Sequence, residues 1–176
     1  KSLDISAGQR VLMVVKDSPE FFYLLFGAIK MGAVPVPVNT IMRADDYRYL
    51  IEDSECRAVV YSPEFAGSVE AAIEGADHEP AHALMTEGRG ALGDHMARAS
   101  TDLAPTGAVP GDDCFWLYSS GSTGKPKGVV HAHQDMVFTG QCVGAEMLAM
   151  GEDDSCFSMS KLFHSYGFGN AMTFPL

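Results

Sequence analysis

The residues with the clearest capacity for chemistry form one short stretch of the chain, Tyr118-Ser119-Ser120-Gly121-Ser122-Thr123-Gly124-Lys125-Pro126-Lys127-Gly128. Glycines lack a Cβ, so they let the backbone turn its N–H groups toward a ligand. A row of such N–H groups makes an anion-binding nest, to which serine and threonine hydroxyls add further donors. Lysine supplies a mobile positive charge for phosphate oxygens. The stretch therefore predicts a loop that binds the phosphates of a nucleotide.

This loop differs from the common P-loop of nucleotide-binding proteins. A P-loop requires Gly five residues before its Gly-Lys pair and Ser or Thr directly after it. Here Ser119 and Pro126 occupy those two positions. An ordinary surface loop is the alternative, because Ser, Thr and Gly gather in loops generally. Pro126 and the lysines, between two apolar runs typical of strands, favour the phosphate-binding interpretation.

The same stretch closely resembles the phosphate-binding signature of the adenylate-forming enzymes. These include acyl-CoA and aryl-CoA synthetases, peptide-synthetase adenylation domains and firefly luciferase. Ser119 and Ser122 stand where many members carry Thr, which keeps the hydroxyl. The resemblance implies that ATP is bound by Ser119, Ser120, Gly121, Ser122, Thr123, Gly124, Lys125, Pro126 and Lys127.

A second segment, residues 161–176, resembles the acyl-pocket region of the same family, and of benzoate- and hydroxybenzoate-CoA ligases in particular. Those enzymes mostly carry Phe-Ala where this chain has His164-Ser165. The resemblance implies that the acid is bound by His164, Ser165, Tyr166 and Gly167, whereas Phe168 is expected in the core. The alternative is that all these aromatic side chains pack in the core at the start of a helix.

The resemblance implies a two-step reaction on an aromatic, benzoate-like carboxylic acid. The carboxylate attacks the α-phosphorus of ATP, which is taken with Mg²⁺, and coenzyme A then displaces AMP to form a thioester. Catalytic residues and the metal-binding Glu are expected beyond residue 176, and no metal site is expected before it. Two alternatives stay open: an adenylation domain that passes its acid to a carrier-protein thiol, and an inactive truncated binding remnant.

His131 and His133 lie two residues apart at the end of an expected strand, where they would share one face as metal ligands can. The sequence places no third ligand beside them. We therefore expect a pair of histidines near the nucleotide loop and leave their role open.

The composition of the chain argues against several classes of function. Lys and Arg total 12 against 23 Asp and Glu, a net charge of −11, which argues against nucleic-acid binding. The most apolar run, residues 21–29, is too short to cross a membrane. Four widely spaced cysteines form no metal-binding or disulfide pattern, and reduced thiols are typical of a cytoplasmic protein.

Alternation of apolar strands with helices predicts an α/β fold with layered sheets and helices, as in the large N-terminal domain of an adenylate-forming enzyme. We expect an α/β subdomain at 1–100, a linker at 101–112 and the start of a second subdomain at 113–176. Both subdomains are expected to be incomplete, as part of the first half of a longer enzyme. The elements expected are strands at 11–15, 33–38 (an edge or irregular strand), 57–61, 84–85, 114–117, 128–131 and 155–159, and helices at 19–31, 44–54, 63–75, 92–98 and 134–150, with a loop entering a helix at 161–170.

Overall fold

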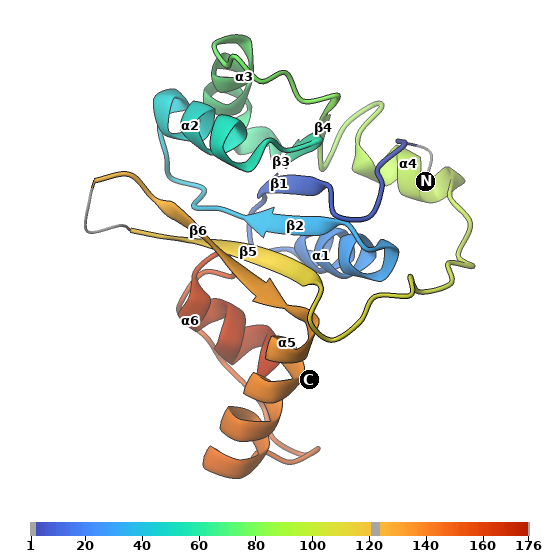
Figure 1. The fold of residues 1–176 in the computed structure, drawn as a ribbon, viewed down its shortest axis with the longest axis vertical. Coiled ribbons are helices and arrows are strands. Elements are labelled where there is room, and N and C mark those ends of the chain that lie inside the picture. Colours follow the sequence, from blue (N-terminus) through green and yellow to red (C-terminus); the bar gives the residue numbers. More distant parts are fainter. Residues whose placement is uncertain (1–2, 121–123, 176) are drawn as a thin grey trace.

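The computed structural model describes residues 3–120 and 124–175 and has the predicted α/β fold (Figure 1). Its first half builds a four-stranded parallel sheet in the order β2-β1-β3-β4. The elements of this half are β1 (Arg10–Val14), α1 (Pro19–Met31), β2 (Val34–Pro37), α2 (Ala44–Ser54), β3 (Ala58–Tyr61), η1 (Pro63–Phe65), α3 (Ala66–Glu74), β4 (His82–Met85) and α4 (Leu92–Arg98).

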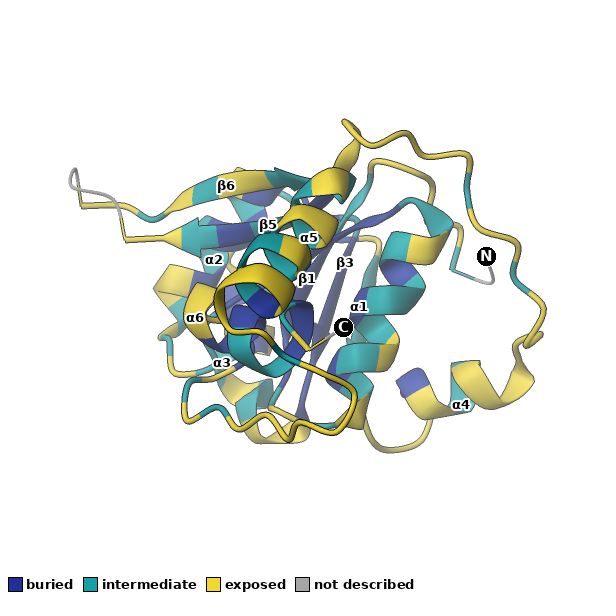
Figure 2. Ribbon diagram, turned by 90° about the horizontal axis from the view of Figure 1, so that it is seen from below, coloured by how far each residue is buried: buried dark blue, intermediate teal, exposed yellow. Residues whose placement is uncertain are grey.

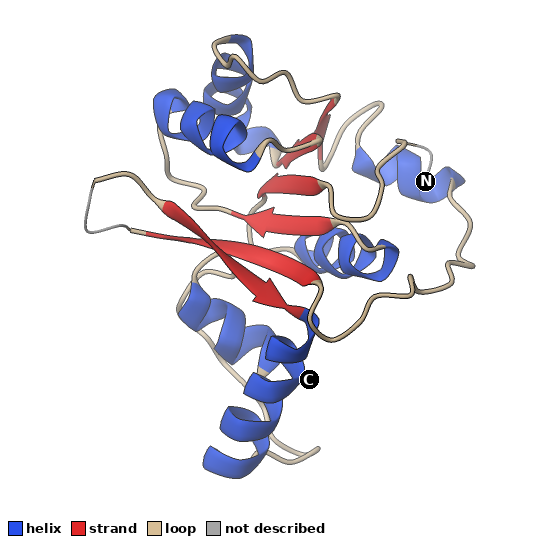
Figure 3. Cartoon of the chain, viewed as in Figure 1, coloured by secondary structure: helices blue, strands red, loops and turns tan. Residues whose placement is uncertain are grey.

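Strand β1 is buried on both faces because its side chains alternate between two cores. Val11 and Met13 pack with α1 on one face, whereas Leu12 and Val14 pack with α2 and α3 on the other. Figure 3 shows the sheet with helices on both faces. The predicted helix start at Ser18-Pro19 is confirmed, and α1 ends at Gly32 with a φ of 82°, in the left-handed region that glycine tolerates.

The second half begins with an antiparallel hairpin of β5 (Asp113–Ser119) and β6 (Lys127–Ala132). It continues with α5 (His133–Thr139), η2 (Gly140–Met147), α6 (Ser165–Phe168) and η3 (Gly169–Thr173). The hairpin lies beside β2, with α5 and α6 on its far side (Figure 1). Strands β1 and β3 are buried, whereas β6 exposes much of its length (Figure 2).

The two halves share one core. Phe115 and Phe168 of the second half belong to the same buried cluster as Val11 and Phe21 of the first. Residues 101–112, the predicted linker, follow α4 without helix or strand. The division of the chain into an α/β subdomain, a linker and a second subdomain stays a prediction.

Two expectations for the second half are corrected by the structure. Phe157 and Met159 alternate with polar residues, yet residues 155–159 form no strand. The two apolar residues are 84% and 89% exposed, so the segment has no buried face that would pair it with a sheet. The predicted helix 134–150 is divided into α5 and the wider-wound η2. A Cβ at Gly144 would strike the Phe174 carbonyl, and one at Gly140 would lie 2.9 Å from the Thr173 carbonyl, so close packing of the chain's end requires both glycines.

Candidate active site

The β5–β6 hairpin carries the predicted phosphate-binding residues. Ser119 pairs with Lys127 where the two strands end, and Gly124 has a φ of +101°, which favours glycine. The described parts of the loop, together with the strand residue Tyr118 that leads into it, are called its two arms below: Tyr118–Ser120 and Gly124–Lys127. The predicted ligands Gly121, Ser122 and Thr123 lie outside the described residues.

The register of the hairpin decides which side chains share a face. Phe115 pairs with His131, Leu117 with Val129, and Ser119 with Lys127, so these six residues lie on one face of the hairpin. Leu117, Ser119, Val129 and His131 line a cavity of about 510 Å³. The alternation places Lys127 on that same face, at its loop end.

This cavity also brings the two predicted binding segments together. Ser119, Ser120 and Pro126 of the loop arms line it, as do His164 and Ser165 of the predicted acid-binding segment. Further parts of the wall come from Phe163, from Pro37 at the carboxyl end of β2, and from Val38 and Asn39 directly after that strand. Ligands of α/β proteins commonly bind outside the carboxyl ends of the parallel strands. The cavity is therefore the candidate active site.

Sequence reasoning placed His131 near the loop but did not identify it as part of the cavity. Its ring stacks on Phe115 at a centroid distance of 4.7 Å, and Phe115 stacks in turn on Phe168 at 4.7 Å. His131 Nδ1 also lies 3.7 Å from Asp135 Oδ2. Side chains two residues apart in a strand share a face, so the sequence could have placed His131 on the same face as Lys127 and Val129. His133 does not share this face, because β6 ends at Ala132 and His133 begins α5.

The predicted acid-binding segment is only partly in the cavity. His164 precedes α6, and its Nδ1 accepts a hydrogen bond of 3.4 Å from the Tyr166 N–H. The Tyr166 side chain is 66% exposed and is not among the residues that line the cavity. A Cβ at Gly167 would strike the carbonyls of Ser160 and Lys161, so its missing side chain serves backbone packing. Phe168 is in the core, as predicted.

Asp17, in the turn between β1 and α1, holds the start of this segment. Its Oδ1 accepts a hydrogen bond of 3.1 Å from the Leu162 N–H, and its Oδ2 lies 3.4 Å from Lys161 Nζ. Leu162 is buried in the core that contains β1. These contacts connect the first strand–helix turn with the residues that lead into His164.

Helix α2 holds both arms of the loop. The Tyr118 hydroxyl donates to Asp53 Oδ2 at 2.7 Å, and the Tyr49 hydroxyl lies 2.9 Å from the Pro126 carbonyl oxygen. Lys125 Nζ lies 4.6 Å from the centroid of the Tyr49 ring. Burial raises the pKa of the Tyr118 hydroxyl above its ordinary value, and the hydrogen bond to Asp53 raises it further. The same two causes raise the pKa of Tyr49.

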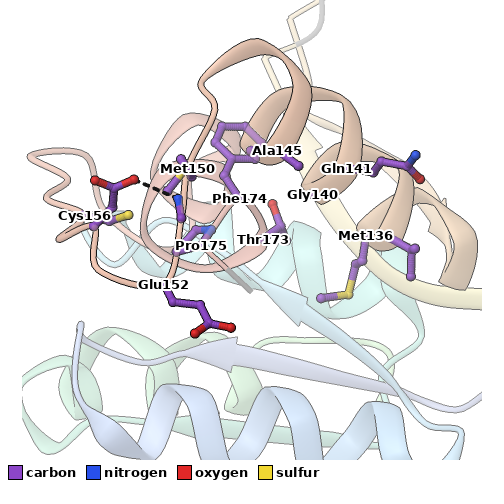
Figure 4. Close-up of a pocket in the computed structure, with 14 residues that line it drawn as sticks. Met136, Gly140, Gln141, Ala145, Met150, Glu152, Cys156, Thr173, Phe174 and Pro175 are labelled. Atoms are coloured by element: carbon purple, nitrogen blue, oxygen red, sulfur yellow. Dashed lines mark hydrogen bonds between the residues drawn. The ribbon is translucent and has the colours of Figure 1, made fainter.

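A larger cavity of about 700 Å³ lies elsewhere, between α5–η2 and the end of the chain (Figure 4). Met136, Gly140, Phe174 and Pro175 are among its lining residues. Of the predicted phosphate- and acid-binding residues that the structure describes, none lines it. Size alone therefore does not identify the active site here, and the chemistry of the lining favours the smaller cavity.

Within residues 3–120 and 124–175, no helix combines the length and the apolar character that a membrane span requires. No group of three or more His, Cys, Asp or Glu side chains gathers there in an arrangement that could hold a metal ion.

Known proteins resemble the chain along its whole length. The sequence model of the family described as AMP-binding enzyme matches residues 1–176. Benzoate–CoA ligase of Thauera aromatica is 39% identical over 177 residues, which cover 99% of this chain and 33% of the ligase. The 4-hydroxybenzoate–CoA/benzoate–CoA ligase of Rhodopseudomonas palustris is 38% identical over 183 residues, with 99% and 33% covered.

A solved structure agrees with these sequence matches. A benzoate CoA ligase from Burkholderia xenovorans LB400 superposes with a TM-score of 0.89 at 31% identity, over 99% of this chain and 34% of that one. The chain thus spans about a third of the length of the relatives it matches. The predicted resemblance to the adenylate-forming enzymes is confirmed: the chain belongs to the AMP-binding enzyme family, and the relatives that it matches are named as CoA ligases.

Proposed function

We propose that the enzyme to which this chain belongs activates an aromatic, benzoate-like carboxylic acid with ATP and transfers it to coenzyme A. The observation that carries the proposal is the shared cavity, whose wall combines Ser119 and Ser120 of the phosphate loop with His164 and Ser165 of the acid-binding segment. A carboxylate and the α-phosphorus of ATP must meet in one place, and such a cavity serves that need. The names of the matched ligases support the choice of acid.

In the first step a carboxylate oxygen attacks the α-phosphorus, a new P–O bond forms, and the bond to pyrophosphate breaks. Phosphoryl transfer depends mainly on positioning and charge stabilisation. We assign these tasks to the hydroxyls of Ser119, Ser120, Ser122 and Thr123, to the backbone N–H groups of the loop, and to Lys127. Gly121, Gly124 and Pro126 shape the loop, and Lys125 makes a secondary contact. These groups hold the β- and γ-phosphates as pyrophosphate departs.

In the second step the sulfur of coenzyme A, whose thiol proton passes to solvent, attacks the acyl carbon; a C–S bond forms, and AMP leaves with the electrons of the broken C–O bond. The acid is held against the wall of the cavity by His164 and Ser165. Tyr166 and Gly167, which lie outside the cavity lining, are proposed as further contacts on the strength of the family resemblance alone. The Phe163 and His131 rings in that wall offer stacking surfaces to a planar acid. A flexible fatty chain gains no such stacking and loses more rotamer freedom on binding.

Mg²⁺ enters this proposal as the counter-ion of ATP. Magnesium prefers carboxylate and phosphate oxygens, and the described residues that line the cavity include no Asp or Glu. We therefore assign no described residue to the metal. Because ATP and coenzyme A are substrates of the cell interior and the four cysteines are free thiols, we further propose a cytoplasmic location.

Two assays of the full-length enzyme test the proposal. Benzoate or a hydroxybenzoate should drive exchange of labelled pyrophosphate into ATP, and adding coenzyme A should yield the aryl thioester and AMP. Octanoate should be used at least about tenfold less efficiently, measured as kcat/KM, since it lacks the stacking contacts of a ring. Exchange without any coenzyme A thioester would indicate a carrier-protein acceptor instead. Octanoate turned over as well as every benzoate would exclude the aromatic assignment.

A further inference from the structure

Helix α2 lies far before the phosphate loop in sequence, yet it contacts both of the loop's arms. Tyr118 of the first arm donates its hydroxyl proton to Asp53 Oδ2 at 2.7 Å, a length typical of a hydrogen bond to a charged acceptor. On the second arm, the Pro126 carbonyl oxygen lies 2.9 Å from the Tyr49 hydroxyl. Tyr49 and Asp53 are four residues apart, so they occupy one face of the helix.

Both tyrosine hydroxyl protons in this cluster have hydrogen-bond acceptors. Asp53 Oδ2 accepts from Tyr118, while Oδ1 lies 3.1 Å from the Tyr49 hydroxyl. The single hydroxyl proton of Tyr49 is therefore shared between two acceptors, Asp53 Oδ1 and the Pro126 carbonyl. Burial and the nearby carboxylate raise the pKa of both phenols, so both stay protonated, and hence donors, at neutral pH. The Asp53 carboxylate is thus fixed from both sides.

The helix that bears this cluster is itself rigidly placed. Tyr47, Leu50 and Ile51 are buried in the core that includes the parallel sheet, on a different face of the helix from Tyr49 and Asp53. The Tyr49 ring is also covered by Lys125, whose ammonium lies 4.6 Å from the ring centroid. A helix anchored in the core therefore holds the loop before and after its glycine-rich centre.

Holding both arms in place is important for a loop that is rich in glycine and serine. Glycine and serine have many accessible conformations, so aiming their N–H and hydroxyl groups at phosphate costs conformational entropy. Fixing both arms in advance lowers that cost and pre-organises the donors for the transition state.

We propose that Tyr49 and Asp53 are positioning residues for ATP: they tie the two arms of the phosphate loop to α2 and so set the geometry in which the β- and γ-phosphates are bound. This inference rests on the proposed function for its reaction step. It assigns the two side chains no contact with substrate. The competing explanation is that the cluster only stabilises the fold, and the experiment below separates the two.

The test uses Asp53→Asn and Tyr49→Phe in the full-length enzyme. Asp53→Asn would turn one of the two acceptors into a donor facing a tyrosine hydroxyl, and Tyr49→Phe would keep the ring under Lys125 but remove the bond to Pro126. The matched control is Tyr61→Phe, because the Tyr61 hydroxyl also bonds a carboxylate, Glu70 Oε1 at 2.9 Å, which belongs to α3 and not to a loop arm. Melting temperatures of all variants report the purely structural cost.

We expect both α2 variants to raise the KM for ATP and to lower kcat/KM for acid-dependent pyrophosphate exchange on the order of tenfold. Thioester formation from supplied aryl adenylate, which carries no β- or γ-phosphate, should keep its rate, as should the KM for the acid. Calorimetric titration should show weaker binding of ATP and unchanged binding of AMP. Tyr61→Phe should lose comparable thermal stability without any of these kinetic changes.

Equal losses in both half-reactions, or equal weakening of ATP and AMP binding, would assign the cluster to stability and overturn the inference. Wild-type ATP kinetics in both α2 variants would overturn it as well. The nucleotide titrations make this outcome independent of the proposed function. An enzyme that binds ATP but activates no aromatic acid would refute that function, while the contrast between ATP and AMP would still decide the role of Tyr49 and Asp53.

Discussion

At the scale of single residues, the strand register distinguishes the two lysines of the phosphate loop. Lys127 pairs with Ser119 and lies on the cavity-facing side of the hairpin, whereas the Lys125 ammonium rests over the Tyr49 ring. In the proposed reaction, a charge on the cavity side can follow the departing pyrophosphate, while one engaged by an aromatic face is less available to it. The two lysines are therefore not equivalent, although the sequence presents them two residues apart.

We predict that Lys127→Ala in the full-length enzyme slows adenylation about ten- to a hundredfold, because a hydrogen bond to a charged group contributes roughly 1.5–3 kcal/mol. Pyrophosphate exchange measures this step. Lys125→Ala should have a clearly smaller effect, and Lys30→Ala, at the end of α1, should serve as the neutral control. If thioester formation from supplied adenylate suffered as much as exchange, Lys127 would be a structural residue.

His164 is the polar member of the proposed acid-binding segment that lines the cavity with its neighbour Ser165. Since its imidazole can donate or accept a hydrogen bond, we predict that it selects acids with a hydroxyl or amino substituent. His164→Phe should reduce kcat/KM for the substituted acid more than that for benzoate. His133→Gln, at the start of α5 and outside the cavity lining, provides the comparison. An unchanged ratio of the two acids in His164→Phe would remove this role from the histidine.

At the scale of elements, the turn after β1 supports the proposed acid-binding segment through Asp17. Asp17→Ala removes both the acceptor for the Leu162 N–H and the partner of Lys161. We predict a KM for the acid that rises roughly three- to tenfold, with the KM for ATP unchanged. Asp17→Asn retains an oxygen for the Leu162 N–H and should stay near wild type. A similar rise in both variants would point to the exposed ion pair instead of the backbone contact.

The elements themselves were predictable where local rules decide them. Ser18-Pro19 and Gly32 bound α1 because an extended residue with Pro after it starts a helix and a left-handed glycine ends one. Pro35 and Pro37 indicated an edge or irregular strand, and β2 is a regular strand at the edge of the four-stranded sheet. The predicted strand at 155–159 was wrong, because alternation indicates a strand only when one face of the segment is buried, and here Phe157 and Met159 are both exposed.

Less of the candidate site was predictable, because the sequence reveals only those site residues that belong to a local pattern. The motif residues of the loop, with His164 and Ser165, were identified because each belongs to a local pattern. Tyr49 and Asp53 carry no such pattern, since their partners lie 77 and 65 residues further along the chain. His131 was noticed, but its place in the cavity depends on the pairing of β6 with β5. Contacts between distant segments arise only when the chain folds.

At the scale of the whole molecule, one buried core that contains Phe115 and Phe168 joins the two halves of the chain. Phe115 is 4% exposed, stacks with His131 and Phe168, and shares its core with β1 and α1. A common core makes the two halves depend on each other for stability, although the sequence suggests two subdomains. The chain also contains a single tryptophan, Trp116, on the hairpin.

We predict that Phe115→Ala destabilises the 176-residue chain by about 3–5 kcal/mol, the usual cost of removing a buried phenylalanine side chain. Urea unfolding should be followed by Trp116 fluorescence, which reports the hairpin, and by far-UV circular dichroism, which reports the helices. Both curves should coincide and shift together in the variant, whereas Val109→Ala, in an exposed stretch, should leave them in place. Two separate transitions would support independent subdomains at 1–100 and 113–176.

The attachment of the phosphate loop to α2 has a genetic consequence. A side chain that is held by a partner in another segment cannot vary freely, because a change at Tyr118 leaves Asp53 with an unmatched oxygen. Defects in the loop should therefore be repaired by second-site suppressors in α2, and Tyr49, Asp53 and Tyr118 should covary when homologues diverge. In a screen for revertants of a Tyr118→Phe strain, we expect suppressing substitutions at Asp53, 65 codons upstream of the lesion.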